Sequence, residues 1–273
     1  MHSCACGVNF GDEIKPELTV STPWGTVRIQ RCSACSLAQT ADFLSLENLA
    51  QIYEGADVYR PGSREVFEAQ VTSFNHVVQD LKKLQITSGR ILEIGCNTGF
   101  ALVAFRKRDF DVTGVEKNPE CSEYARSRYA LRVFSDLSEI PKGEQFQVIF
   151  ISHLLEHLVS INKFLMDIHR FTEVGSVLYV KTPNYSSLIA KYALRGKWPG
   201  FIPLQHVWYF EKKTLTNLLS KHGYVPIRLY TRIFAFASSK NPLKLAGRVV
   251  LGTLEKLLDR GSEIVGIYRC IEP

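Results

Sequence analysis

The segment Arg90–Phe100 constrains the fold more than any other part of this 273-residue chain. It begins with a short apolar run, Ile91–Ile94, of the kind expected for a buried parallel strand. Gly95 and Gly99 then bracket three small residues, and a helix-forming stretch follows from Ala101. A strand that passes through a glycine-bearing turn into a helix N-terminus is where α/β proteins bind nucleotide-like ligands.

Alternating strand and helix patterns surround this segment. Short apolar runs predict strands, and apolar residues at three- and four-residue spacing predict helices. Strands are expected over residues 91–94, 111–116, 131–134, 146–151, 176–181, 225–230 and 263–269. Helices are expected over residues 64–84, from 118 onward, and over 161–170, 214–222 and 241–259. This order predicts the α/β class, as a doubly wound and mostly parallel sheet.

The charge and hydropathy of the chain limit its partners. Lysine and arginine number 33 against 27 acidic residues, a mild excess that permits an anionic substrate and does not demand nucleic acid. No apolar stretch of about 18 residues is present, so we expect no membrane span. The first residues lack the layout of a signal peptide, and seven cysteines in such a chain indicate thiols or metal ligands, so we expect a cytoplasmic protein.

Two close cysteine pairs distinguish the first 40 residues, namely Cys4 with Cys6 and Cys32 with Cys35. Four thiolates are the ligand set of a structural tetrahedral zinc ion, and they leave no open position for catalysis. We therefore expect a zinc-knuckle-like module over residues 1–40. Because one residue, and not two, separates the first pair, reduced cysteines without zinc are the alternative, and His2 is a candidate substitute ligand.

The glycine-bearing turn departs from the dinucleotide pattern. Asn97 and Phe100 stand where Gly-x-Gly-x-x-Gly needs glycines, so close approach of a pyrophosphate is hindered. Glu93 can hold an ammonium group, the helix N-terminus offers N–H groups to a carboxylate, and Glu116 can accept from both hydroxyls of a ribose. Ammonium, carboxylate and ribose together describe S-adenosylmethionine more closely than NAD.

These residues carry a family resemblance. Glu93–Gly99 resembles the first motif of class I S-adenosylmethionine-dependent methyltransferases, and Glu116 matches the ribose-binding acid of that family. The resemblance implies a seven-stranded Rossmann-like methyltransferase sheet over residues 85–273, preceded by a linker and an amphipathic helix over 41–84. It implies a cofactor site formed by Glu93, Gly95, Cys96, Asn97, Gly99, Glu116, Ser135, Asp136, Ser152 and His153.

A finer resemblance concerns the acceptor. The segment Phe146–Leu158, with its Leu-Glu-His core, is similar to methyltransferases of quinone biosynthesis and of sugars. The cysteine module, Thr182–Asn184, His206–Phe210 and the run from Arg260 to Val265 fit the same group. The resemblance implies a small-molecule acceptor, such as a sugar nucleotide or another glycan precursor.

Three residues are candidates for catalysis. Glu156 and His157 follow the fourth expected strand at the carboxyl edge of the sheet, where ligands bind, although they can instead only cap or buttress the next helix. His206 lies in an aromatic insertion over about 183–210 and is our first choice of general base, since histidine titrates near neutral pH. A packed structural histidine is the alternative. Second-rank candidates for contact with the acceptor are Tyr53, Tyr59 and Tyr185.

The sequence leaves three alternative functions to consider. An RNA methyltransferase could use the zinc module to grip nucleic acid, but the sequence has no concentrated basic patch and no base-methylation motif after the fourth strand. Gln147 replaces the usual acidic residue of that strand, which makes a methyltransferase-like binding module without catalysis conceivable. An NAD enzyme is disfavoured by Asn97 and Phe100.

Overall fold

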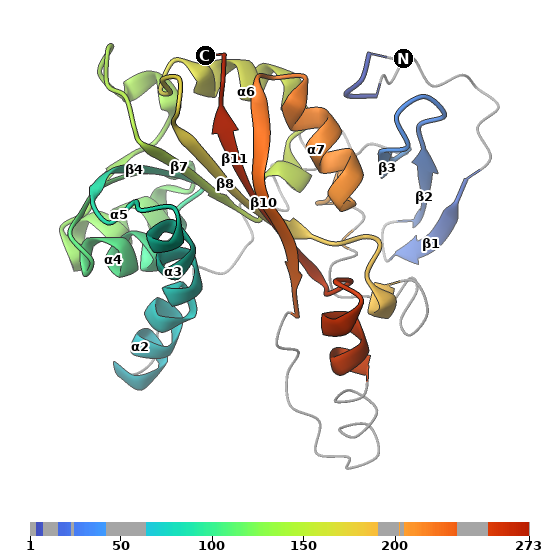
Figure 1. The fold of residues 1–273 in the computed structure, drawn as a ribbon, viewed down its shortest axis with the longest axis horizontal. Helices are drawn as coiled ribbons and strands as arrows, with labels where there is room; N and C mark the ends of the chain where they lie inside the picture. Colours follow the sequence, from blue (N-terminus) through green and yellow to red (C-terminus); the bar gives the residue numbers. More distant parts are fainter. Residues whose placement is uncertain are drawn as a thin grey trace. The chain divides into compact units, whose positions relative to one another are not determined.

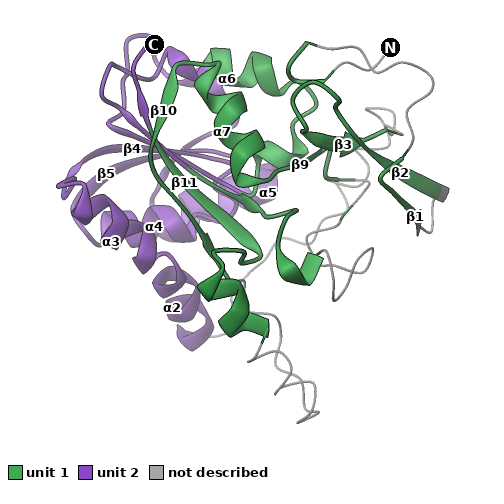
Figure 2. Ribbon diagram, turned by 45° about the vertical axis from the view of Figure 1, so that its right-hand side comes forward, with its two compact units in different colours: residues 1–50, 153–167, 180–268 green, residues 51–152, 168–179, 269–273 purple. Residues whose placement is uncertain are grey.

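The computed structural model describes residues 4–7, 16–22, 25–41, 64–190, 202, 205–233 and 251–272, drawn as ribbons in Figure 1. The chain divides into two compact units, which Figure 2 colours separately. Unit 1 comprises Met1–Ala50, His153–Asp167 and Val180–Tyr268. Unit 2 comprises Gln51–Ser152, Ile168–Tyr179 and Arg269–Pro273. Each unit is described by itself.

The principal sheet has seven strands in the hydrogen-bonded order β10-β11-β8-β7-β4-β5-β6. Their bounds are β4 (Gly89–Ile94), β5 (Phe110–Val115), β6 (Arg132–Phe134), β7 (Val148–Ser152), β8 (Val177–Pro183), β10 (Tyr224–Arg232) and β11 (Glu263–Cys270). The pairs β4–β5, β4–β7 and β5–β6 are parallel. The predicted seven-stranded, mostly parallel α/β sheet is therefore confirmed.

Strand β11 runs against its neighbour β8. The N–H of Gly175, just before β8, donates to the carbonyl of Cys270 at the end of β11 (2.8 Å). The N–H of Asn184, just after β8, donates to the carbonyl of Ser262 at the start of β11 (2.8 Å). The start of one strand thus meets the end of the other, which defines an antiparallel pair.

The order of strands reverses at β4. The next strand along the chain, β5, pairs on one side of β4, and β7 pairs on the other. In open α/β sheets, ligands bind outside the carboxyl ends of the strands at such a reversal. The turn that follows Ile94 lies at this point.

The helices of unit 2 include α2 (Arg64–Ser73), α3 (Asn75–Lys83), α4 (Phe100–Arg106), α5 (Pro119–Tyr129) and the short η1 (Leu137–Glu139). Asn118 caps α5, because its side chain accepts the N–H groups of Glu120 (3.0 Å) and Cys121 (3.1 Å). Pro119 occupies the first turn, where its missing N–H has no consequence. The predicted start of this helix is confirmed.

The expected single helix over residues 64–84 is wrong, since the structure has two helices, α2 and α3, with a break at Phe74. The Ser73 hydroxyl donates to the carbonyl of Gln70 (2.6 Å), a side-chain bond that competes with the helix and bends it. Phe67 of α2 stacks on Tyr129 (centroids 5.3 Å apart) and meets Phe100 edge-on (5.9 Å). Hydrophobic periodicity does not register such a break because the three- and four-residue spacing of Val71, Phe74 and Val78 continues through it.

The remaining helices are η2 (Leu155–His157), α6 (Ile161–His169) and α7 (Lys212–Ser220). A helical segment also covers residues 251–257, while residues 241–250 of the expected last helix lie outside the described part. Among the described helices, none has the length and apolar character needed to cross a bilayer.

A second sheet, in unit 1, has the order β1 (Leu18–Thr22), β2 (Gly25–Arg31), β3 (Ala38–Thr40) and β9 (Trp208–Tyr209), all antiparallel. Its inner side packs Ile29, Ala38, Tyr185, Ile189, Ala190 and Tyr209. Strand β9 comes from the aromatic insertion, immediately after His206. The N-terminal hairpin and the insertion are therefore joined by one sheet.

Candidate functional site

The glycine turn (residues 95–99) has a backbone that few residues can adopt. Gly95 (φ +77°), Asn97 (φ +47°) and Gly99 (φ +86°) all lie in the left-handed region. A Cβ at Gly99 would lie 2.5 Å from Leu131 Cδ1 and 3.3 Å from Ala125 Cβ, so glycine is required there for space as well as for conformation. The turn delivers the chain directly into α4, whose first turn presents backbone N–H groups.

Asn97 replaces the glycine that the motif usually has. Asparagine tolerates the left-handed conformation better than other side chains do. Its side-chain oxygen accepts the N–H of Thr98 (2.7 Å), which holds the turn locally. The departure from the motif is therefore compatible with the turn.

Glu116 joins the glycine turn to the loop that follows β5. Its carboxylate accepts the N–H of Asn97 (2.8 Å) through one oxygen and the N–H of Asn118 (2.8 Å) through the other. A carboxylate has about four acceptor sites, so these bonds leave capacity for hydroxyl donors of a ligand. The sequence predicted Glu116 only as a ligand-binding acid, so it did not indicate this structural role.

Two further members of the predicted set lie beside the turn. Glu93 is buried (4% exposed) near the end of β4. Cys96 is also buried, and a Cβ at Gly114 would lie 2.7 Å from its sulfur, so the thiol packs against β5. Burial raises the pKa of the Cys96 thiol well above its usual range, which leaves it unreactive.

Ser135 and Asp136 follow β6, beside β5. Asp136 begins η1 and accepts both the N–H (2.9 Å) and the hydroxyl (2.8 Å) of Ser138. These hydrogen bonds lower the pKa of the Asp136 carboxyl. Because Glu116 N–H donates to the carbonyl of Phe134 (2.9 Å), the ends of β5 and β6 are side by side, and the predicted residues meet at one edge of the sheet.

His153 lies directly after Ser152, the last residue of β7, and belongs to unit 1. Its backbone is left-handed (φ +52°), and its Nε2 lies 2.8 Å from a carboxylate oxygen of Glu263. The Lys181 ammonium approaches the same carboxylate at 3.1 Å. Burial lowers the pKa of His153, but hydrogen bonds to Glu156 and Glu263 outweigh it and raise the pKa to about 9. His153 is thus a cation at neutral pH and not a base.

Glu156, His157 and His206 form a compact group, the histidine cluster, with potential ligand atoms all within 4.8 Å of one another. The rings of His157 and His206 meet edge-on, with centroids 4.6 Å apart. Glu156 is 1% exposed and His206 is 5% exposed, while His157 is half-buried. The structure therefore brings all three predicted catalytic residues together.

Hydrogen bonds from neighbouring strands and loops hold the side chains of the histidine cluster. The Thr182 hydroxyl of β8 donates to Glu156 Oε2 (3.0 Å), and His157 Nδ1 lies 3.0 Å from the carbonyl oxygen of Gln205. Burial raises the pKa of Glu156, but His153 outweighs it and the net shift is downward. Burial lowers the pKa of His157. A neutral imidazole beside a carboxylate is suited to take up a proton.

The second sheet positions His206. The Thr40 hydroxyl at the end of β3 donates to the carbonyl of His206 (2.8 Å), and Thr40 N–H donates to the carbonyl of Val207 (2.9 Å). On the other side, Val207 N–H donates to the carbonyl of Glu156 (2.7 Å). The backbone around His206 is thus held by Thr40, 166 positions away in the chain, and by Glu156, 50 positions away.

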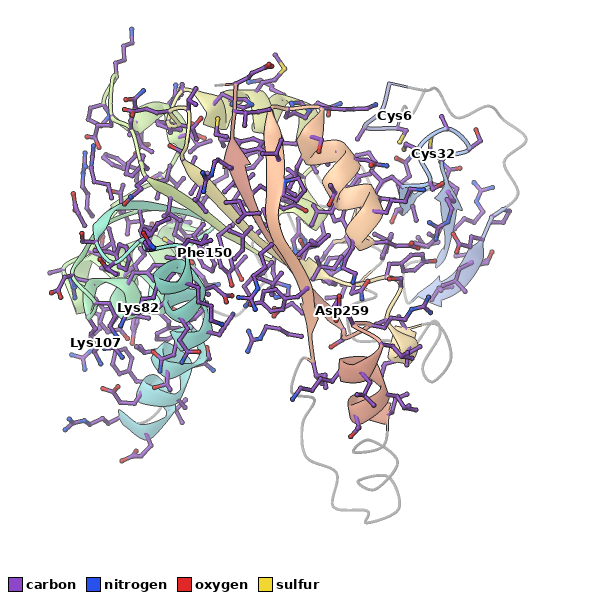
Figure 3. All side chains as sticks on the ribbon, in the orientation of Figure 1. Cys6, Cys32, Lys82, Lys107, Phe150 and Asp259 are labelled. Carbon is purple, nitrogen blue, oxygen red and sulfur yellow. The ribbon has the colours of Figure 1, made fainter. Side chains whose placement is uncertain are left out.

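The four predicted zinc ligands form the cysteine cluster, in unit 1. Cys4 Sγ lies 3.4 Å from Cys35 Sγ, Cys6 Sγ lies 3.5 Å from Cys32 Sγ, and all four sulfurs are within 4.8 Å of one another. Cys6 and Cys32 are labelled in Figure 3. Zn–S bonds of about 2.3 Å in a tetrahedron place sulfurs roughly 3.8 Å apart, so the cluster fits a zinc ion. His2 lies outside the described residues.

The thiols of the cysteine cluster have unequal acidity. Burial raises the pKa of Cys32, but the N–H groups of Cys35 and Ala34 outweigh it and lower the pKa to about 7. Burial also raises the pKa of Cys4, and there it dominates. A metal ion would bind all four as thiolates, because its charge replaces the protons.

Several residues that contact the candidates were not assigned a role from the sequence. Glu263 and Lys181 hold His153, while Thr182 and Gln205 contact the histidine cluster. A signal existed for Glu263, since it is an acid at the start of an otherwise apolar strand. Of the second-rank candidates, Tyr185 is buried against Tyr209, and Tyr53 and Tyr59 lie outside the described residues.

Gln147, which replaces the usual acidic residue of the fourth expected strand, lies away from the site. It precedes β7, at the amino end of the strand, whereas the site follows the carboxyl end at Ser152. A Cβ at Gly89 would lie 2.1 Å from the Gln147 side chain, so Gln147 packs against the start of β4. Its lack of charge has no bearing on the site, which removes the argument for a binding module without catalysis.

A reversed parallel sheet, a glycine turn entering a helix and an acid after the next strand define a class I methyltransferase. The methyltransferase domain family matches residues 67–229, which is more than half of the chain. The chain belongs to this family and is an S-adenosylmethionine-dependent methyltransferase. No curated protein sequence matches it.

Solved structures share the fold at low sequence identity. An S-adenosylmethionine-dependent methyltransferase from Archaeoglobus fulgidus is 17% identical, with a TM-score of 0.52 over 82% of this chain and 100% of that one. A possible histamine N-methyltransferase from Thermotoga maritima is 18% identical, with a TM-score of 0.53 over 83% and 97%. The plantazolicin methyltransferase BpumL, solved with S-adenosylhomocysteine, is 15% identical, with a TM-score of 0.52 over 83% and 90%.

Proposed function

We propose that this enzyme methylates a small molecule, and that the acceptor is a sugar nucleotide or another glycan precursor. The burial of the histidine cluster carries this proposal, because Glu156 is 1% exposed and His206 is 5% exposed. A small acceptor can be enclosed at such a position, whereas a folded polymer needs a more open surface. The resemblance of the Leu-Glu-His segment to sugar methyltransferases supports the same acceptor class.

The methyl donor is assigned to the glycine turn and its neighbours. Bound S-adenosylmethionine supplies an activated methyl group on a sulfonium, so the protein chiefly has to position the acceptor in a dry site. We assign Glu93 to the ammonium group, the N-terminus of α4 to the carboxylate and Glu116 to the ribose hydroxyls. We also assign Ser135 and Asp136 to the adenine, and Ser152 to the same pocket of unit 2.

The acceptor proton is assigned to the histidine cluster. We propose His206 as the general base, with His157 beside its ring and Glu156 orienting the pair. The downward shift in the pKa of His157 favours a neutral His157 imidazole beside His206, and Glu156 can stabilise the imidazolium that forms.

The cysteine cluster is assigned a structural zinc ion. Four sulfur ligands leave no open coordination position, so the ion would hold the β2–β3 hairpin, whose turn carries Cys32 and Cys35, and would not take part in chemistry. Through the β3–β9 pair, this hairpin supports the backbone on either side of His206. We also propose that the enzyme acts in the cytoplasm and binds no nucleic acid.

Transfer of a labelled methyl group into fractionated extract tests the acceptor class. We expect label in low-molecular-weight sugar nucleotides or glycan precursors. Label in RNA would overturn the proposal in favour of an RNA methyltransferase. The matched control is His206→Asn, which should transfer no label while still binding S-adenosylmethionine in a thermal-shift titration.

A further inference from the structure

We propose that Glu156, His157 and His206 bind a divalent first-row transition-metal ion, separate from any ion in the cysteine cluster. The three potential ligand atoms lie within 4.8 Å of one another, and two of the residues are almost fully buried. The sequence separates His206 from the other two by about 50 positions, so only the fold assembles the set.

The ligand set suits such an ion. Two imidazoles and one carboxylate, with positions left open, are typical of catalytic zinc and of non-haem iron sites. Bonds of about 2.0–2.2 Å place the ligand atoms roughly 3–3.5 Å apart around the ion. A shift of about 1 Å, within the reach of the half-buried His157 ring, therefore closes the site.

The surrounding hydrogen bonds present the ligand atoms correctly. A carbonyl oxygen can only accept, so His157 Nδ1 carries the proton in its bond to Gln205, which makes Nε2 the ring nitrogen able to bind an ion. The Thr182 hydroxyl orients the Glu156 carboxylate through Oε2. Partners of this kind are typical of the residues around metal ligands, where they fix the tautomer and the orientation.

The second carboxylate oxygen of Glu156 provides an independent indication. Oε1 is buried, and among the described residues its contact is a long one, to Nδ1 of the His153 ring at 3.4 Å. His153 is held more closely by Glu263, at 2.8 Å. One long contact leaves this buried carboxylate oxygen with acceptor capacity that a metal ion can use.

The ion would also narrow the acceptor class to hydroxyl compounds, an assignment that rests on the proposed function. Three protein ligands leave a position for the acceptor oxygen, and a bound cation lowers the pKa of a coordinated hydroxyl. The hydroxyl then loses its proton to water. With the ion bound, His206 acts as a ligand, and its role as general base applies to the protein without the ion. Binding of the ion itself depends only on the three side chains.

Cobalt titration of the full-length, metal-stripped protein tests the site without donor or acceptor. Thiolate ligands give strong charge-transfer absorption, whereas nitrogen and oxygen ligands do not, so the two sites can be told apart. We expect a bound cobalt ion without charge-transfer absorption, lost in Glu156→Gln, His157→Asn and His206→Asn. The control His76→Asn changes a half-buried histidine of α3 and should retain it.

A graded variant keeps the test decisive if a ligand variant fails to fold. Thr182→Val preserves the shape of the side chain and removes only the hydrogen bond to Glu156, so we expect cobalt to bind ~10–100-fold more weakly. Cobalt bound only through thiolates, or a second cobalt ion unaffected by any of these variants, would overturn the inference. Neither result would contradict methyl transfer, which is measured separately.

Discussion

The glycine turn and the histidine cluster are two sites built in opposite ways. The glycine turn and its acid, Glu116, span about two dozen consecutive residues of unit 2 and are held by backbone N–H groups. The histidine cluster belongs to unit 1 and joins Glu156, His157 and His206, with Thr40 in support. The glycine turn depends on local backbone conformation, whereas the histidine cluster depends on pairing between strands far apart in the chain. We therefore expect changes in each unit to affect different steps.

The largest effect is expected from Cys32→Ser. Loss of a thiolate should prevent binding of the proposed zinc ion and weaken the hairpin that pairs with β9, next to His206. A displacement of about 1 Å at a reacting group lowers turnover ~100-fold, so methyl transfer should fall at least that far. Affinity for S-adenosylmethionine, measured by calorimetry, should stay within a few-fold of wild type.

The control for this experiment is Cys121→Ser, which changes a buried cysteine of α5 in unit 2. The zinc content of Cys121→Ser, measured by elemental analysis, should equal that of the wild type. Equal loss of donor binding and turnover in Cys32→Ser would show that the two sites do not respond separately.

Gly99→Ala tests the glycine turn in unit 2. The new Cβ would clash with Leu131, and the alanine would have to adopt a left-handed backbone. Together, the clash and the backbone strain should lower the free energy of unfolding by about 2–5 kcal/mol. Chemical denaturation measures this loss. Gly143→Ala is matched, since Gly143 has φ +85° with nothing within 4 Å of its Cβ, so only about 1–2 kcal/mol should be lost. Equal losses of unfolding free energy in Gly99→Ala and Gly143→Ala would show that the contact with Leu131 contributes nothing.

Glu116→Gln tests whether the acid has both a structural and a ligand-binding role. The amide can accept from only one of the two N–H groups that the carboxylate now serves, and it carries no charge. A lost charge-assisted hydrogen bond is worth about 1.5–3 kcal/mol, so affinity for the donor should fall ~10–150-fold. Glu120→Gln, a nearby change in the first turn of α5, should bind the donor as wild type does. Unchanged affinity in Glu116→Gln would contradict the ligand-binding role.

The smallest effect concerns Asp259 of unit 1, labelled in Figure 3. Burial raises the pKa of its carboxyl, but the Lys212 ammonium and Thr231 outweigh it and the net shift is downward. Its stabilisation is therefore present above the unfolded pKa of about 3.9 and is lost as pH falls through the lower folded value. Asp259→Asn keeps a residue suited to the left-handed backbone (φ +48°), so only the charge is tested.

The measurement is thermal unfolding of the wild type and of Asp259→Asn at a series of pH values. The two melting temperatures should differ at neutral pH and converge as pH falls below about 4. Asp109→Asn, at another left-handed aspartate (φ +66°), is the control and should show a smaller difference. A difference that grows towards low pH would contradict the sign of the effect.

The strands were predictable to within about two residues, because buried strands are short apolar runs bounded by polar turns. Strand β7 was expected over 146–151 and covers Val148–Ser152. The break at Phe74 and the packing of Gln147 against Gly89 were missed. Both depend on a side-chain hydrogen bond or a neighbouring strand, which the hydrophobic pattern does not encode.

The sequence by itself determined the class of fold, the glycine turn and the position of Glu116, because these depend on residues close together in the chain and on backbone conformation. Only the tertiary structure decided that His206 meets Glu156 and His157, that β9 joins the N-terminal hairpin, and that Glu263 keeps His153 charged. Such contacts join residues about 50 to 170 positions apart, as from Val207 to Glu156 and from Thr40 to His206. Their pairing follows from strand order and burial, which no local pattern specifies.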